Sequence, residues 1–251
     1  MPLSPCYLGG GGSESDESQL WDQLFTNPDP TTHHIAVWPW AQPQSSWPDL
    51  QAWVASAVAP RGIPASHVTL GTSPPAFGLD EADVLVIPGG NAFELLDHMR
   101  TRGLMQALKQ AHARGSVRVY GGSAGALVQG RDVSIIDAAI GGLDDNTIGM
   151  EDCTAADFLG GWSVYPHFEG GFVGRLAELC RKWSRERGIK VMGIPEKCGV
   201  KVEGGEWARN AGPEDVWCFE PNGKEWVVKA GERFPLRDLP RPVEEEDVVV
   251  H

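Results

Sequence analysis

The sequence predicts an α/β fold: a doubly wound, mostly parallel sheet flanked by helices, with an antiparallel β extension near the C-terminus. Three observations support this prediction. Strand-like and helix-like segments alternate through the first three quarters of the 251 residues, as in sheets that helices cover on both faces. The apolar run at residues 84–87 is unbroken, which is typical of a strand buried on both faces. After Gly188 the apolar runs become short and are separated by Gly, Asn and Pro turns, which indicates antiparallel strands added to the same sheet.

Each parallel strand is expected where a short apolar run is bounded by turn or polar residues. The five runs are residues 5–8, 35–38, 67–70, 84–87 and 116–120. Helices are expected between them, where serine and acidic caps precede apolar residues at helical spacing. The clearest helices are residues 15–25, 46–58 and 92–113, the last with an interruption at Gly103.

The C-terminal part is expected to hold short strands and then a solvated end. The strand-like runs are residues 191–194, 200–202, 216–219 and 226–228. Residues 244–247 are consecutive acids, a composition typical of a solvated segment. We therefore interpret residues 1–241 as a single domain and residues 242–251 as an acidic tail.

The charge balance and the lack of targeting signals bear on partners and location. With 34 acidic and 21 basic residues the formal charge is −13, which would repel a phosphate backbone, so nucleic-acid binding is not expected. The N-terminal stretch lacks the features of a signal peptide, and no run approaches the roughly 18 apolar residues that span a bilayer. We expect a cytoplasmic protein without membrane association.

Cysteine and tryptophan content point to an ordinary packed core. The five cysteines are scattered and form no C-x-x-C pair, so we expect reduced thiols, with neither a disulfide framework nor a zinc site. The ten tryptophans are expected mainly to fill the core. The alternative is that some of them form an exposed interface in a homo-oligomer.

The most informative motif surrounds Ser123. Residues 121–125 read Gly-Gly-Ser-Ala-Gly, between a strand-like run and a segment that can continue as a helix. A nucleophile elbow has this context, because the serine is held in a strained turn, small neighbours avoid clashes and the next N–H helps to bind an oxyanion. The simpler alternative is a strand-to-helix turn in which Ser123 caps the helix. The context favours the nucleophile.

A nucleophilic serine needs a base, and His167 is the best candidate among the seven histidines. It lies at the carboxyl end of a short apolar run, the edge at which sheets of this class place catalytic groups. The alternative is a histidine satisfied at a loop corner. The other histidines are placed within a helix, at the start of a strand, in the N-terminal part or at the C-terminus.

Two glycine-rich turns follow predicted strands. Residues 89–91 offer free N–H groups at the start of a helix, which suit an oxyanion, although an efficient turn capped by Asn91 is the alternative. Residues 9–12 are four glycines, but no phosphate-loop lysine follows them, and Glu14, Asp16 and Glu17 would repel phosphate. Nucleotide binding is therefore not expected there.

Four segments together resemble the serine peptidase family of aspartyl dipeptidase (peptidase E) and cyanophycinase. They occur in the family's order and are residues 86–96, 121–126, 166–168 and 193–196. The resemblance covers about residues 82–230. It implies a fold similar to class I glutamine amidotransferases, of the flavodoxin-like type, and residues 1–241 would then form one peptidase domain.

The resemblance also implies a Ser-His-Glu triad. Carried onto this sequence, Ser123 is the nucleophile, His167 the base and Glu196 its orienting acid, while the N–H groups of Gly90 and Ala124 form the oxyanion hole. This assignment agrees with the chemistry of serine hydrolases, in which a carboxylate fixes the histidine tautomer.

Two other carboxylates compete with Glu196 for the orienting role. Glu169 forms a His-x-Glu pair with the candidate base, and Asp137 follows the elbow at a place where peptidase E also has an acid. The expected order is Glu196, then Glu169, then Asp137. Asn91 and Arg175 are the expected substrate contacts, since a guanidinium can bind a carboxylate through two hydrogen bonds. Arg175 as the first cation of a helix is the alternative.

The expected function is hydrolysis of short peptides through an acyl-enzyme, without a metal or another cofactor. Dipeptides with N-terminal aspartate are the first candidate substrates. One rival is a cyanophycinase-like hydrolase of β-aspartyl peptides, and the arginines expected just after the histidine of such an enzyme are absent here. Another rival is a catalytically silent amidotransferase-like binding module.

Overall fold

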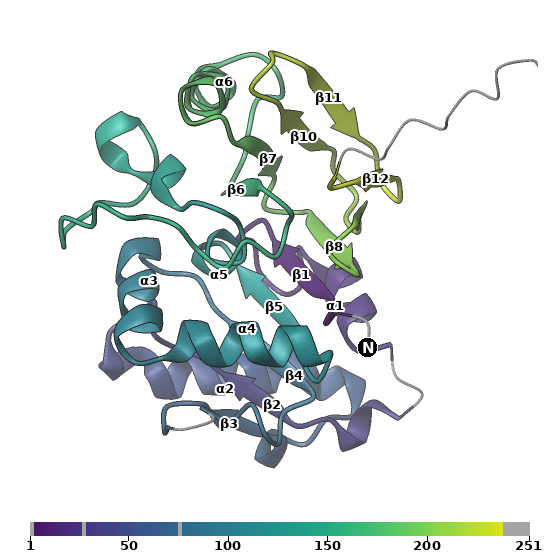
Figure 1. The fold of residues 1–251 in the computed structure, drawn as a ribbon. Coiled ribbons are helices and arrows are strands. Elements are labelled where there is room, and N and C mark those ends of the chain that lie inside the picture. The colour runs from purple at the N-terminus through teal and green to yellow at the C-terminus, as the bar shows by residue number, and fades with distance from the viewer. Residues whose placement is uncertain (1–2, 27–28, 75–76, 238–251) are drawn as a thin grey trace, which may run out of the picture.

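The computed structural model describes residues 3–26, 29–74 and 77–237, and Figure 1 shows their arrangement. The main sheet has eight strands in the order β12-β9-β8-β1-β5-β4-β2-β3. Its parallel part consists of β1 (Cys6–Gly9), β2 (Ile35–Val37), β3 (Val68–Leu70), β4 (Val84–Ile87) and β5 (Arg118–Gly122). These are the runs predicted from the sequence, each displaced by no more than two residues. The predicted fold class is confirmed.

Helices cover both faces of this parallel part. α1 (Ser18–Leu24) and α2 (Trp47–Val58) pack on one face, whereas α3 (Ala92–Thr101), α4 (Leu104–Arg114) and α5 (Ala124–Leu127) pack on the other. In β1, β2, β4 and β5 alternate side chains serve the two cores, because neighbouring residues of a strand point to opposite faces. The expected interruption at Gly103 separates α3 from α4, and its φ of +79° is a conformation that glycine adopts without strain.

A second sheet corrects the expectation of one continuous C-terminal extension. It has the order β11-β10-β7-β6 and contains β6 (Trp162–Pro166), β7 (Lys190–Ile194), β10 (Val216–Phe219) and β11 (Glu225–Val228). β6 and β7 are parallel and are joined by α6 (Arg175–Arg187), as in a βαβ unit. Only β8 (Gly199–Glu203), β9 (Trp207–Asn210) and β12 (Arg233–Pro235) extend the main sheet.

The chain therefore passes between the two sheets in the short connection from β7 to β8. β8 pairs antiparallel with β1, which leaves β7 to pair with β6 and β10. In Figure 1 the second sheet lies above the carboxyl ends of β1 and β5. Those ends are in register, because Gly9 pairs with Gly122. The functional side chains described below gather at this junction.

The cysteines and several tryptophans lie in the core, as the sequence predicts. All five cysteines are buried and unpaired. Trp21, Trp38 and Trp162 are fully buried. Within the described ranges, no helix combines the length and apolar character needed to cross a bilayer. The predicted acidic tail at residues 242–251 lies outside the described residues, and the division into one domain and a tail stays a prediction.

Candidate active site

Ser123 lies in a strained turn between β5 and α5. Its φ of 51° and ψ of −109° form a conformation that residues with a Cβ rarely adopt. The turn packs tightly on β4, since a Cβ added at Gly125 would lie 2.0 Å from the carbonyl oxygen of Ile87. A serine in a sharp strand-to-helix turn with small neighbours has the geometry of a nucleophile elbow.

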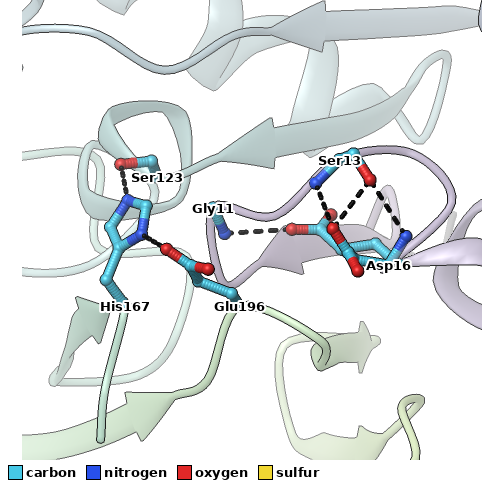
Figure 2. Close-up of polar contacts among 7 residues, drawn as sticks. Gly11, Ser13, Asp16, Ser123, His167 and Glu196 are labelled. Atoms are coloured by element: carbon cyan, nitrogen blue, oxygen red, sulfur yellow. Dashed lines mark hydrogen bonds and ion pairs between the residues drawn. The ribbon is translucent and has the colours of Figure 1, made fainter.

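A continuous hydrogen-bond chain links Ser123, His167 and Glu196 (Figure 2). The Oγ of Ser123 is 3.0 Å from Nε2 of His167, and Nδ1 of His167 is 2.7 Å from Oε1 of Glu196. His167 follows β6, and Glu196 lies in the connection from β7 to β8. The carboxylate accepts a hydrogen bond from the Nδ1–H group, and this fixes the tautomer in which Nε2 is unprotonated and can accept a hydrogen bond from the serine hydroxyl.

The two competing carboxylates lie elsewhere. Glu169 is exposed and lines an open pocket with Pro195 and Trp217, and it makes no hydrogen bond to His167. The Oδ1 of Asp137 accepts the N–H of Ala139 at 2.9 Å and caps a short helical turn. Of the three candidates, only Glu196 contacts the imidazole.

The expected oxyanion donors are free to bind a ligand. Within the described part of the chain, neither the N–H of Gly90 nor that of Ala124 donates to a protein group. Nε2 of Gln42 donates to the carbonyl oxygen of Gly89 at 2.9 Å. Because C=O and N–H point in opposite directions across a trans peptide, this bond directs the N–H of Gly90 away from Gln42. Sequence reasoning missed Gln42.

Asn91 and Arg175 both have protein partners. The side-chain oxygen of Asn91 accepts the N–H groups of Phe93 and Glu94, each at 3.0 Å, and its Nδ2 donates to the carbonyl of Asp145. A direct substrate contact by Asn91 would require it to exchange one of these bonds. Nη2 of Arg175, the first residue of α6, donates to the carbonyl oxygen of Gly141 at 2.6 Å. The other guanidinium N–H groups of Arg175 make no hydrogen bond to the described residues.

Asp144 is a carboxylate near the site that sequence reasoning missed. Its Oδ2 accepts the N–H of Ala92 at 2.8 Å, at the N-terminal end of α3 and two residues after Gly90. Burial raises the pKa of Asp144, and the nearby His167 opposes that rise. Among the described residues no cation forms an ion pair with Asp144. It is therefore a partly buried, unpaired acid beside the oxyanion turn.

The four glycines of residues 9–12 also belong to the site. The carbonyl of Gly9 accepts the N–H of Ser123 at 3.3 Å, and that of Gly10 accepts the N–H of His167 at 2.7 Å. A Cβ on Gly11 would lie 2.3 Å from Cε1 of His167, so the glycine backbone packs directly on the imidazole. The sequence signal for this part of the site was the run of four glycines after β1. The sequence excluded a phosphate-binding loop there but did not indicate a role at the active site.

The α/β fold, with a serine at a strand-to-helix turn that is hydrogen-bonded to a histidine, has the arrangement of a serine-type hydrolase. The model of peptidase family S51 matches residues 7–209, so the chain belongs to that family and is a serine-type peptidase. The resemblance inferred from the sequence is confirmed.

Named relatives and a solved structure agree with this family. Peptidase E of Citrobacter koseri is 27% identical over 208 residues, which cover 78% of this chain and 84% of the relative. Peptidase E of Salmonella typhimurium is 27% identical over 212 residues, with the same coverage of 78% and 84%. The crystal structure of a peptidase from an acI-B1 Actinobacterium superposes with a TM-score of 0.65 at 15% identity, covering 93% of this chain and 97% of that chain. At that identity the structural match concerns the fold alone.

Proposed function

We propose that this peptidase hydrolyses short peptides through an acyl-enzyme, and that dipeptides with N-terminal aspartate are its preferred substrates. The observation that carries the proposal is the hydrogen-bond chain from Ser123 through both ring nitrogens of His167 to Glu196. The name peptidase E, carried by relatives that match 78% of the chain, supports a dipeptidase activity. No step requires a metal or an organic cofactor.

In the acylation step, the Oγ of Ser123 attacks the carbonyl carbon of the scissile bond while Nε2 of His167 takes the hydroxyl proton. The imidazolium that forms is stabilised by Glu196, which holds the Nδ1 proton. The tetrahedral oxyanion lies between the N–H groups of Gly90 and Ala124, which have no other partner within the described residues. His167 then returns the proton to the leaving amine as the C–N bond breaks.

Deacylation repeats these steps with water as the nucleophile. His167 takes a proton from water, the hydroxide attacks the ester carbonyl, and the proton passes back to Oγ of Ser123 as the C–O bond breaks. The side chain of His167 is 29% exposed, so a water molecule can approach the imidazole.

We propose that two charged residues select peptides whose N-terminal residue has a free α-ammonium group and an acidic side chain. Asp144 has no cationic partner within the described residues and lies beside the oxyanion turn, close to the place we assign to the α-ammonium of a dipeptide whose first carbonyl is attacked. Arg175 retains N–H groups for a substrate carboxylate. Arg175 donates to the carbonyl oxygen of Gly141, which lies three residues before Asp144, so both charged residues border the same loop. We assign Asp144 to the α-ammonium and Arg175 to the aspartate side chain.

The decisive experiment compares wild type with Ser123→Ala on Asp-Leu, Ala-Leu and β-Asp-Arg. The variant should lose at least about 10³-fold in kcat, because the nucleophile is absent, while its melting temperature stays near that of wild type. Ser56→Ala, an exposed serine on α2, is the matched control and should keep full activity. Retained turnover in Ser123→Ala would remove the nucleophile from the proposal.

The same assay separates the rivals. Faster hydrolysis of β-Asp-Arg than of Asp-Leu would favour a cyanophycinase-like enzyme. A wild-type protein that neither hydrolyses any of these peptides nor reacts at Ser123 with a fluorophosphonate would favour a silent binding module. If the two charged residues act as assigned, Arg175→Gln lowers the preference for Asp-Leu over Ala-Leu, and Asp144→Asn raises KM for both.

A further inference from the structure

Glu17 is a buried carboxylate that the proposed reaction does not use. Only 2% of it is exposed, and it immediately precedes α1. Its Oε1 accepts the N–H of Gly11 at 3.0 Å, and its Oε2 accepts the hydroxyl of Tyr120 at 2.8 Å. Burial of an unpaired carboxylate is costly, so its retention needs a reason.

The loop that Glu17 holds contacts all three members of the candidate triad. Besides accepting the N–H groups of Ser123 and His167, the loop of residues 9–12 packs on the chain around Glu196. A Cβ on Gly12 would lie 2.3 Å from the carbonyl oxygen of Glu196, and one on Gly10 would lie 1.8 Å from that of Pro195. Figure 2 shows Gly11 between the imidazole of His167 and the carboxylate to which it donates.

Glu17 also connects this loop to β5, which leads into the elbow. Tyr120, its second donor, lies in β5 three residues before Ser123 and is buried. One carboxylate therefore ties the loop that supports the base to the strand that carries the nucleophile. A Cβ on Gly9 would lie 2.2 Å from Oε2 of Glu17, so the backbone of the loop also packs on this carboxylate.

We propose that Glu17 is a positioning residue, which holds the loop of residues 9–12 against the triad and so keeps the imidazole of His167 between Ser123 and Glu196. The inference rests on the proposed function, because it concerns the geometry of that site. Glu17 does not touch the substrate. Its effect passes through the backbone of Gly10 and Gly11.

The contact between Glu17 and the loop depends on the protonation state of the Glu17 carboxyl, because both the Gly11 N–H and the Tyr120 hydroxyl donate to it. The ionised carboxylate accepts hydrogen bonds from both the Gly11 N–H and the Tyr120 hydroxyl. When it is protonated, one of its oxygens carries an O–H group, which is itself a donor and therefore weakens one of these two bonds. Burial raises the pKa of Glu17 to about 7, against the lowering by these hydrogen bonds. The titratable groups that face it are the hydroxyl of Tyr120, the carboxylate of Asp16 and the thiol of Cys198, and no cation of the described residues opposes the rise. The loop is therefore held best above neutral pH.

The test measures kcat and KM for Asp-Leu across pH in wild type, Glu17→Gln, Tyr120→Phe and Asp16→Asn. Glu17→Gln should lower kcat about 10- to 100-fold with KM changed less than about twofold, because misplacing a catalytic group by an ångström has an effect of that size. The acidic limb of its log(kcat/KM) profile should be less steep than that of wild type by about one unit of slope, because residue 17 no longer carries a carboxyl that titrates.

The other two variants separate a positioning role from a general loss of packing. Tyr120→Phe removes a hydrogen bond that lowers the pKa of Glu17, so its acidic limb should move to higher pH with little loss at alkaline pH. Asp16→Asn changes a partly exposed carboxylate of the same turn, bonded to Ser13, whose charge raises the pKa of Glu17; it should keep the wild-type plateau kcat, and its acidic limb should move slightly to lower pH, opposite to Tyr120→Phe. Wild-type kinetics and an unchanged acidic limb in folded Glu17→Gln would overturn the inference, as would an unmoved limb in Tyr120→Phe.

A second readout is independent of peptide turnover. The Cε1–H resonance of His167, followed by NMR, should shift or broaden in Glu17→Gln and stay unchanged in Asp16→Asn. If wild type is inactive on every peptide and unreactive to a fluorophosphonate, the proposed function fails, and this resonance still decides the inference. An unchanged His167 resonance in Glu17→Gln would overturn it.

Discussion

Ser123 and His167 both have positive φ values, 51° and 53°, in a region that residues with a Cβ rarely occupy. Each such conformation has an energetic cost of about 1–3 kcal/mol and persists only where its surroundings hold it. Here the backbone N–H groups of both residues donate to the same loop, at Gly9 and Gly10. The strained conformations of Ser123 and His167 are therefore supported by one glycine segment.

A methyl group on Gly11 should disable this support. In Gly11→Ala the new Cβ would lie 2.3 Å from Cε1 of His167, so the imidazole must move away from Ser123, and kcat/KM should fall by about 10²-fold. Gly103→Ala is the matched control, because Gly103 also has a positive φ of +79° but has open space around it. Steady-state kinetics and thermal melting of both variants check the prediction, and it is contradicted if the two lose activity equally.

The orienting acid can be identified by amide substitution. Glu196→Gln replaces the acceptor that holds the Nδ1 proton of His167 at 2.7 Å, and kcat should fall by about 10²-fold. Glu169→Gln and Asp137→Asn change carboxylates that do not contact the imidazole, so both should keep near-wild-type kcat. A larger loss in either control than in Glu196→Gln would reassign the role.

At the scale of elements, the site is built from connections rather than from helices or strands. The candidate catalytic residues come from three connections: Ser123 from the β5–α5 turn, His167 from the segment after β6 and Glu196 from the β7–β8 connection. The loop after β1 supports these three, and the turn from β4 to α3 adds Gly90. The carboxyl ends of β1, β4 and β5 lie at one edge of the main sheet, and the connections after β6 and β7 of the second sheet meet them there, so residues far apart in sequence converge.

The connection after β2 contributes through Gln42. Removing its bond to the Gly89 carbonyl in Gln42→Ala should leave the N–H of Gly90 less well oriented, and kcat should fall about tenfold while KM changes little. Gln44→Ala, an exposed glutamine two residues later, is the control and should match wild type. A rise in KM without a change in kcat would instead place Gln42 in substrate binding.

Most of the elements could be predicted because their signals are local. Apolar runs and caps marked the parallel strands and the helices to within a few residues. β9 and β12 were not predicted, because residues 207–210 and 233–235 mix charged and apolar side chains. Their pairing depends on the edges that other strands offer: β9 pairs with β8, and β12 pairs with β9. The second sheet was missed for the same reason, since partner choice is not encoded in a short apolar run.

At the scale of the whole molecule, Glu17 should make stability depend on pH. Burial raises its pKa from the ordinary value of 4.5 to about 7, so the native state binds a proton that the unfolded chain has released. This contribution to stability is complete below pH 4.5 and is lost as pH rises through about 7.

This pH dependence can be measured as the difference in the free energy of unfolding between wild type and Glu17→Gln. Between pH 5 and 8 the free energy of unfolding of wild type should fall by about 3 kcal/mol relative to Glu17→Gln. Urea denaturation of both proteins at each pH checks this, and the difference cancels the opposite effect of carboxyls whose pKa is lowered, such as Glu203 and Glu225. Parallel stability curves would contradict it. Burial of Glu17 thus stabilises the fold at low pH through the protonated carboxyl, whereas the hydrogen bonds that hold the loop of residues 9–12 require the ionised carboxylate, which forms as pH rises through about 7.

The sequence by itself determined the α/β class, the order of the parallel strands along the chain, the family and the candidates Ser123, His167 and Glu196, because these depend on local pattern and on short motifs. The tertiary structure alone decided which carboxylate meets the imidazole, how the C-terminal strands divide between two sheets and that the loop of residues 9–12 contacts Ser123, His167 and Glu196. The physical reason is that each of these depends on contacts between residues distant in the chain, whose partners no local pattern specifies. Glu17 is the clearest case. In the sequence it is one acid among several before a helix, and in the fold it is a buried hydrogen-bond acceptor that joins β5, the strand before Ser123, to the loop that packs on His167.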